Sequence, residues 1–152
     1  MNQSKLIMER IKDRQSRSWE GVFYATRRMD LLVVSISGAG IYVCLETIKY
    51  LKDNQLESAS LVKLSGVILL IAIVVNFASQ ILGRKSNYHD YLMCDYQLDD
   101  YEEPSEENKI KIREHDKSSD CYSKITGFLN SSSAILMLSG LLLMIIYYFT
   151  MF

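Results

Sequence analysis

Histidine, cysteine and acidic side chains gather between residues 84 and 124, where they are the groups best suited to bind a metal. If this stretch folds back on itself near residue 104, residue i faces roughly residue 209 minus i on antiparallel helices. The facing sets are then Cys94 with His115, and His89 with Asp120 and Cys121. Thiolate, imidazole and carboxylate groups are zinc ligands. The stretch has no CxxC or HxxxH spacing, however, and we predict no metal and no cofactor.

Catalytic motifs are also missing from the sequence. Two His-Asp dipeptides, at 89–90 and 115–116, have no second partner motif beside them. No Gly-rich phosphate loop and no nucleophile elbow occurs. With 17 basic and 18 acidic residues, the net charge of -1 argues against a dedicated nucleic-acid binder. We therefore predict a protein that is not an enzyme and has no nucleic-acid partner.

Uncharged polar residues inside apolar runs form a second candidate set. On the same facing rule, Asn76 lies level with Ser133, and Ser79 lies level with Asn130. Small and amide side chains hold helices together in lipid, and they also line water or ion pathways. Both interpretations stay open, although no ionisable group accompanies these residues in the two longest apolar runs. The predicted polar membrane layer comprises Ser35, Asn76, Ser79, Gln80, Asn130 and Ser133.

Three apolar segments position these residues. Residues 64–83 and 125–152 carry no charge, and each is long enough for the roughly 20 residues that a spanning helix needs. A third segment, 31–51, has 15 uninterrupted apolar positions before Glu46 and Lys49, so a re-entrant or interfacial helix is its alternative. Too little chain remains to bury two such helices in a soluble core. The sequence therefore predicts membrane spans at 31–51, 64–83 and 125–152.

Basic residues give this bundle an orientation. Residues 1–30 hold seven Lys and Arg, the connection 52–63 holds few, and the second span ends at Arg84 and Lys85. By the positive-inside rule the N-terminus is cytoplasmic and the C-terminus lies outside. We expect a multi-pass protein of a membrane such as the bacterial inner membrane, with the bilayer itself as a partner.

The N-terminal stretch 1–30 predicts a basic amphipathic cytoplasmic helix. A basic helix with a Trp/Phe face suits an anionic membrane surface. The alternative is that this face packs on the protein's own cytoplasmic helices. The lipid-surface candidates are Arg10, Arg14, Arg17, Trp19, Phe23, Arg27 and Arg28.

Residues 84–124 predict a charged cytoplasmic helical hairpin that extends the second and third spans. Pro104 ends the first arm, and Ser105 occupies an N-cap position before two glutamates. The tip, 99–107, holds six acids in nine residues, which is typical of a solvated turn and is also a candidate docking site. The partner-binding candidates are Tyr91, Cys94, Leu98, Tyr101, Asp99, Asp100, Glu102 and Glu103.

Together these features predict an all-α integral membrane protein with three transmembrane helices, an N-terminal amphipathic helix and a cytoplasmic helical hairpin. The expected function is that of a non-enzymatic, oligomeric membrane assembly or anchoring subunit that docks a partner through its cytoplasmic helices. The alternative is an oligomeric pore or membrane-disrupting effector that is triggered from the cytoplasmic side.

Overall fold

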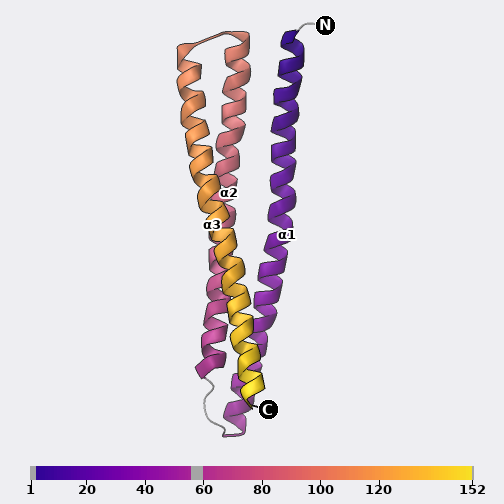
Figure 1. Cartoon of the computed structure of the whole chain (residues 1–152), viewed down its shortest axis with the longest axis vertical. Helices are drawn as coiled ribbons and strands as arrows, with labels where there is room; N and C mark the ends of the chain where they lie inside the picture. The colour runs from indigo at the N-terminus through magenta and orange to yellow at the C-terminus, as the bar shows by residue number, and fades with distance from the viewer. Residues whose placement is uncertain (1–2, 56–59, 152) are drawn as a thin grey trace. The chain divides into compact units, whose positions relative to one another are not determined.

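The computed structural model describes residues 3–55 and 60–151, apart from the side chains of residues 3–6, 22, 23, 25–27, 29 and 30. These residues form the helices α1 (Gln3–Asp53), α2 (Ser60–Glu102) and α3 (Glu106–Met151), and no strand occurs among them (Figure 1). The prediction of an all-helical chain is confirmed. Three helical segments are long and apolar enough to cross a membrane, namely Leu31–Asp53, Ser60–Glu102 and Glu106–Met151.

Helix α1 is continuous where the sequence suggested two elements, 1–30 and 31–51. Its interior contains no proline, and Gly21 does not interrupt it. The helix ends at residues 54 and 55. The amide of Asn54 donates to the carbonyl of Tyr50, and Gln55 adopts a left-handed conformation with φ of 53°. Such a residue commonly closes the last turn of a helix.

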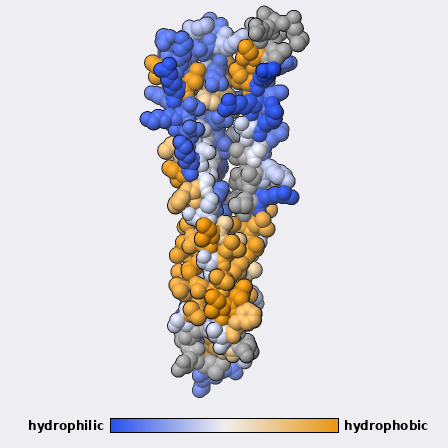
Figure 2. Space-filling model, in the orientation of Figure 1, coloured by the Kyte–Doolittle hydropathy of each residue, from blue (hydrophilic) through white to orange (hydrophobic). Residues whose placement is uncertain are grey.

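The chain divides into two compact units, and every helix contributes to both. Unit 1 comprises Met1–Arg27 and Gln80–Gly127, whereas unit 2 comprises Arg28–Ser79 and Phe128–Phe152. Hydrophobic residues cover most of the visible face of unit 2, and hydrophilic residues cover most of that of unit 1 (Figure 2). This division follows the segregation of charge along the sequence.

The core of unit 2 is built around one leucine of α2. Leu69 is fully buried and lies between two glycines, Gly40 of α1 and Gly140 of α3. A Cβ atom added at Gly140 would lie 2.7 Å from Leu69 Cγ, and one added at Gly40 would lie 2.7 Å from Leu69 Cδ1. The two glycines therefore leave the space that this side chain fills, and they let the three helices pack closely.

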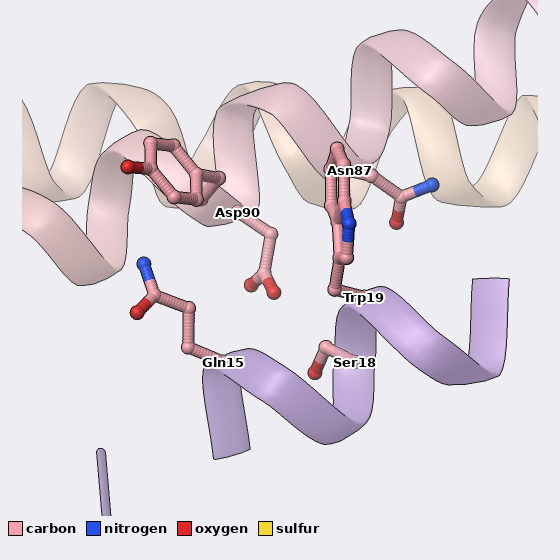
Figure 3. A pocket seen from close by; sticks show the side chains of 6 residues that line it. Gln15, Ser18, Trp19, Asn87 and Asp90 are labelled. Carbon is pink, nitrogen blue, oxygen red and sulfur yellow. The ribbon is translucent and has the colours of Figure 1, made fainter. Parts of the chain in front are cut away.

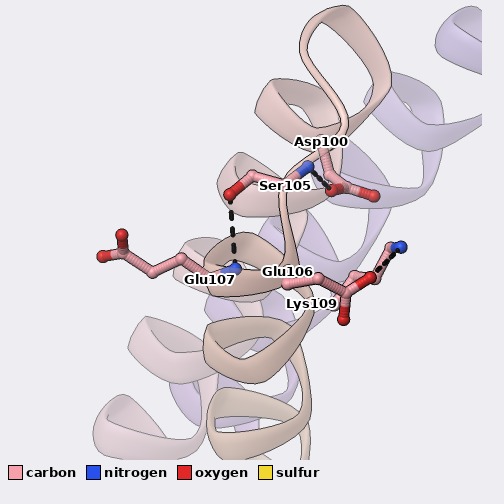
Figure 4. Close-up of polar contacts among 5 residues, drawn as sticks. All are labelled: Asp100, Ser105, Glu106, Glu107 and Lys109. Carbon is pink, nitrogen blue, oxygen red and sulfur yellow. Dashed lines mark hydrogen bonds and ion pairs between the residues drawn. The ribbon is translucent and has the colours of Figure 1, made fainter.

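The turn between α2 and α3 is fixed by hydrogen bonds at residues 100–107. The amide of Ser105 donates to Asp100 Oδ1 at 2.8 Å, and the amide of Glu107 donates to Ser105 Oγ at 3.2 Å (Figure 4). Ser105 thus caps the N-terminus of α3, as its position after Pro104 predicts. Glu106 pairs with Lys109 at 2.7 Å within the first turns of the same helix.

Candidate functional site

The main candidate site is an aromatic groove in unit 1, between α1 and α2. Trp19 of α1 and Tyr91 of α2 lie with ring centroids 6.5 Å apart and planes inclined by 55°. Tyr88 lies one turn before Tyr91 and lines the same open groove, together with Gln15 and Ser16, around a volume of about 550 Å³. Trp19, Tyr88 and Tyr91 are 50%, 59% and 45% exposed, so three large aromatic side chains meet water here.

A small polar niche adjoins this groove. It is lined by the groove residues Gln15, Trp19 and Tyr91 and by Ser18, Asn87 and Asp90. Asp90 extends from α2 toward the α1 side chains of Gln15 and Ser18 (Figure 3). Asp90 is half-buried, and no hydrogen bond or ion pair joins its carboxylate to another residue in the described part of the chain.

A pair of histidines links α2 to α3 in the same unit. His89 Nδ1 and His115 Nδ1 lie 2.9 Å apart, so one ring donates a hydrogen bond to the other. Each ring also stacks on a tyrosine, His89 on Tyr122 and His115 on Tyr96. Desolvation by burial, with smaller contributions from the charges of His115 and Lys85, lowers the pKa of His89 below its usual value. The pair therefore favours a state with at least one neutral ring.

The structure does not gather the residues considered as zinc ligands. His89 faces His115, which the facing rule had placed opposite Cys94. Cys94 is buried, and Cys121 is exposed. Burial and the charge of Asp90 raise the pKa of the Cys94 thiol, which disfavours the thiolate that binds metals. Within residues 3–55 and 60–151, no three His, Cys, Asp or Glu side chains form a group that would hold a metal ion.

Most residues of the predicted polar layer lie where the helices of this chain pack against one another. Asn76, Ser79 and Ser133 are buried in unit 2, and Ser79 Oγ donates to Asn130 Oδ1 at 2.5 Å. This is the pair that the facing rule predicts. Ser35 is exposed and does not join the buried set, because its position points away from the core-facing stripe of α1. Gln80 is half-buried at the start of the α2 segment of unit 1.

The partner-binding candidates divide between the surface and the interior. Cys94 is buried, so it is not available to a docking protein. Asp100 is occupied by the turn, where it accepts the Ser105 amide. Tyr91 is part of the aromatic groove. Leu98 is half-buried, and four candidates are exposed, namely Asp99, Tyr101, Glu102 and Glu103.

The lipid-surface candidates lie on α1. Arg10, Arg14, Arg17 and Arg28 are exposed, and Arg17 Nε donates to the carbonyl of Asp13. Trp19 contacts Tyr91 of α2. At this residue the face of α1 therefore packs on another helix of the chain, which is the alternative to lipid binding. The side chains of Phe23 and Arg27 lie outside the described part of the structure. Binding of this helix to lipid stays a prediction.

Sequence reasoning missed several buried polar residues of unit 2. Ser65 Oγ donates to the carbonyl of Gly140 at 2.6 Å and accepts from Cys44 Sγ at 3.7 Å, which joins all three helices. Ser37 is also fully buried. A pattern that reveals Ser65, although not Ser37 of α1, runs along α2 at alternating spacings of three and four, the period of a coiled-coil seam. Its members are Val62, Ser65, Leu69, Ala72, Asn76, Ser79, Gly83, Ser86, Asp90 and Met93.

Comparison with known proteins gives no relative. No family model matches the chain, and neither the curated proteins nor the solved structures contain a significant match.

Proposed function

We propose that this protein is a non-enzymatic, membrane-anchored docking subunit whose unit 1 binds a partner protein. In this proposal the apolar segments of unit 2 form the anchor, with the N-terminus in the cytoplasm and the C-terminus outside. The basic N-terminal stretch, compared with the sparsely basic connection 52–63, supports that orientation. Unit 1 is then a cytoplasmic body, and the bacterial inner membrane is a fitting location.

The aromatic groove of unit 1 carries this proposal. Trp and Tyr are the residue types that contribute most to protein–protein binding, because they bury a large apolar area and keep a polar group for hydrogen bonding. Trp19, Tyr88 and Tyr91 are about half exposed and line one groove together. Covering them with a partner removes apolar area from water, and this favours complex formation.

The interior of unit 2 supports an anchoring role. Asn76, Ser79 and Ser133 are buried, and Ser65 and Ser79 donate hydrogen bonds to α3. Such bonds stabilise a bundle within the bilayer by about 0.6–2 kcal/mol each. Exposed aliphatic residues of α3, such as Leu138 and Leu142, are suited to lipid or to a neighbouring copy, so a homo-oligomer is part of the proposal.

Site-specific photo-crosslinking tests the docking role. A crosslinking amino acid at Ser16, on the exposed rim of the groove, is activated in cells that make the protein naturally. We expect one adduct of defined mass that disappears with Tyr91→Ser and persists with Ile110→Ser. Ile110 is an exposed apolar residue of α3 in the same unit, so it is the matched control. Identical adducts in both variants would overturn the docking proposal.

A second candidate function is an oligomeric pore, and buried polarity in unit 2 is the observation that favours it. Ser37 is fully buried, and its hydroxyl has no hydrogen-bond partner among the described residues. Buried polar groups without partners destabilise a packed helix bundle, so a rearrangement that hydrates them gains free energy. Membrane depolarisation on expression tests this function. Loss of depolarisation with Asn76→Leu and Gln80→Leu supports the pore, and unchanged depolarisation excludes a role for these two residues in it.

A further inference from the structure

We infer that the niche at Asp90 is a binding site for a primary ammonium group, and that its occupant is a lysine side chain of the partner protein. The inference deepens the proposed docking function and rests on it. Its elements are the carboxylate of Asp90 and the aromatic rings of Trp19 and Tyr91 in the lining of the niche, and space for one small group.

The position of Asp90 on α2 is unusual for a charged residue. It belongs to the core-facing stripe of α2, between Ser86 and Met93, both of which are buried. A carboxylate that is partly removed from water is destabilised unless a cation or hydrogen-bond donors compensate it. The described residues provide neither to Asp90. Its missing counter-charge is therefore expected to come from a ligand.

Among the residues whose side chains are described, no cation of the chain fills this role. Arg14 of α1 is close enough to lower the pKa of Cys94, one turn beyond Asp90, yet it is exposed and forms no ion pair with Asp90. Two ion pairs are local to α3, where Lys109 binds Glu106 and Lys111 binds Glu107. The niche is thus open to a cation from outside the chain.

The size of the niche selects the kind of cation. Its volume is about 10 Å³, which is about the minimum that holds one water molecule. An ammonium is a compact point charge of that size on a flexible four-carbon stem, whereas a guanidinium is a broader planar fork. The stem of a lysine fits the apolar groove beside the niche, where Trp19 and Tyr91 also attract a cation through their ring faces.

Tryptophan fluorescence gives a direct readout, because Trp19 is the one tryptophan of the chain and lines both groove and niche. The full-length protein in detergent micelles is titrated with n-butylammonium chloride, which reproduces the end of a lysine side chain. Potassium chloride holds the ionic strength constant, and butan-1-ol serves as the uncharged analogue. The variants are Asp90→Asn and, as matched control, Asp95→Asn, which removes an exposed carboxylate from the same helix.

We expect a saturable change of Trp19 emission in the wild type and in Asp95→Asn. Binding should weaken by at least about tenfold in Asp90→Asn, since the charge that pairs with the ammonium is gone. Tetramethylammonium, which is too large for the niche, should bind at least about tenfold more weakly than n-butylammonium. Equal binding by Asp90→Asn, a response that does not saturate, or equal binding of the two cations would overturn the inference.

A second readout connects the niche to the partner and separates the two proposals. Crosslinking through Ser16 should fall in Asp90→Asn and persist in Asp95→Asn. If the adduct requires Tyr91 but is insensitive to Asp90→Asn, the docking function survives and the lysine site does not. If n-butylammonium binds through Asp90 but no adduct requires Tyr91, the docking function fails, and the lysine assignment fails with it.

Discussion

Replacing Gly140 by alanine tests the packing of unit 2 most directly. The added Cβ atom would lie 2.7 Å from Leu69 Cγ and 2.9 Å from Leu69 Cδ2, with the Ser65 carbonyl 3.4 Å away. Leu69 Cγ is the branch point of the side chain, so rotating a terminal methyl does not relieve the contact. Overpacking of this kind destabilises a core by about 1–3 kcal/mol.

Gly38→Ala is the matched control, because a Cβ atom at Gly38 meets nothing within 4 Å. Both substitutions improve helix propensity by about 0.8–1 kcal/mol. The difference between the two variants therefore isolates the steric cost at Gly140. Converted at about 1.4 kcal/mol per tenfold, that cost is about 5-fold to about 140-fold in the equilibrium for opening of unit 2.

Thiol labelling of Cys44 measures this opening. Cys44 is 2% exposed and belongs to the same core cluster as Leu69. With Cys94 and Cys121 replaced by serine, it is the remaining thiol of the chain. In detergent micelles, maleimide labelling of Cys44 should be slower than wild type with Gly38→Ala, and faster with Gly140→Ala than with Gly38→Ala by the factor above.

A double variant completes the test. Leu69→Ala alone should cost about 2–5 kcal/mol, because it leaves a cavity between the two glycines. Combined with Gly140→Ala it should cost less than the sum of the single variants, since the new methyl group occupies part of that cavity. Additive costs, or a Gly140→Ala protein that labels as slowly as Gly38→Ala, would refute the packing of Leu69 against Gly140.

Three further predictions concern unit 1. The pKa of His89 is lowered from 6.5 in the fold by burial and then by the charges around it, so the unfolded chain binds more protons below about pH 6.5. The free energy of unfolding of unit 1 should be highest above that pH and fall as the pH drops through the lowered pKa. The variant His89→Asn should flatten this pH dependence, which urea titrations followed by Trp19 fluorescence measure. Ser105→Ala should lower the stability of unit 1 by about 1 kcal/mol and Ser105→Gly by only a few tenths, because the cap of α3 is lost in the first case and largely tolerated in the second. Maleimide should modify Cys121 rapidly and Cys94 slowly at neutral pH, since Cys121 is exposed whereas burial shields Cys94 and raises its pKa. Equal rates of modification would contradict the burial of Cys94.

The all-helical class and the three apolar segments were predictable because they depend on local sequence. Uncharged runs such as 64–83 are long enough to span a bilayer as helices whatever their neighbours are. The Ser79–Asn130 pair was also predictable, because a tight turn near Pro104 fixes the register of two antiparallel helices. The facing rule fails at His115, which meets His89 and not Cys94. The rotation of each helix about its own axis decides which side chains meet and shifts contacts by several residues, and one sequence does not specify that rotation.

What the sequence determined by itself is therefore the helical content, the apolar segments, the cap at Ser105 and the separation of charged from uncharged regions. These features follow from composition, hydrophobic period and short-range hydrogen bonding. The tertiary structure alone decided that Leu69 packs between two glycines and that Trp19 lies against Tyr91. It also placed Asp90 in a niche between α1 and α2. These contacts join residues far apart in the chain, and their geometry depends on how the faces of the helices meet.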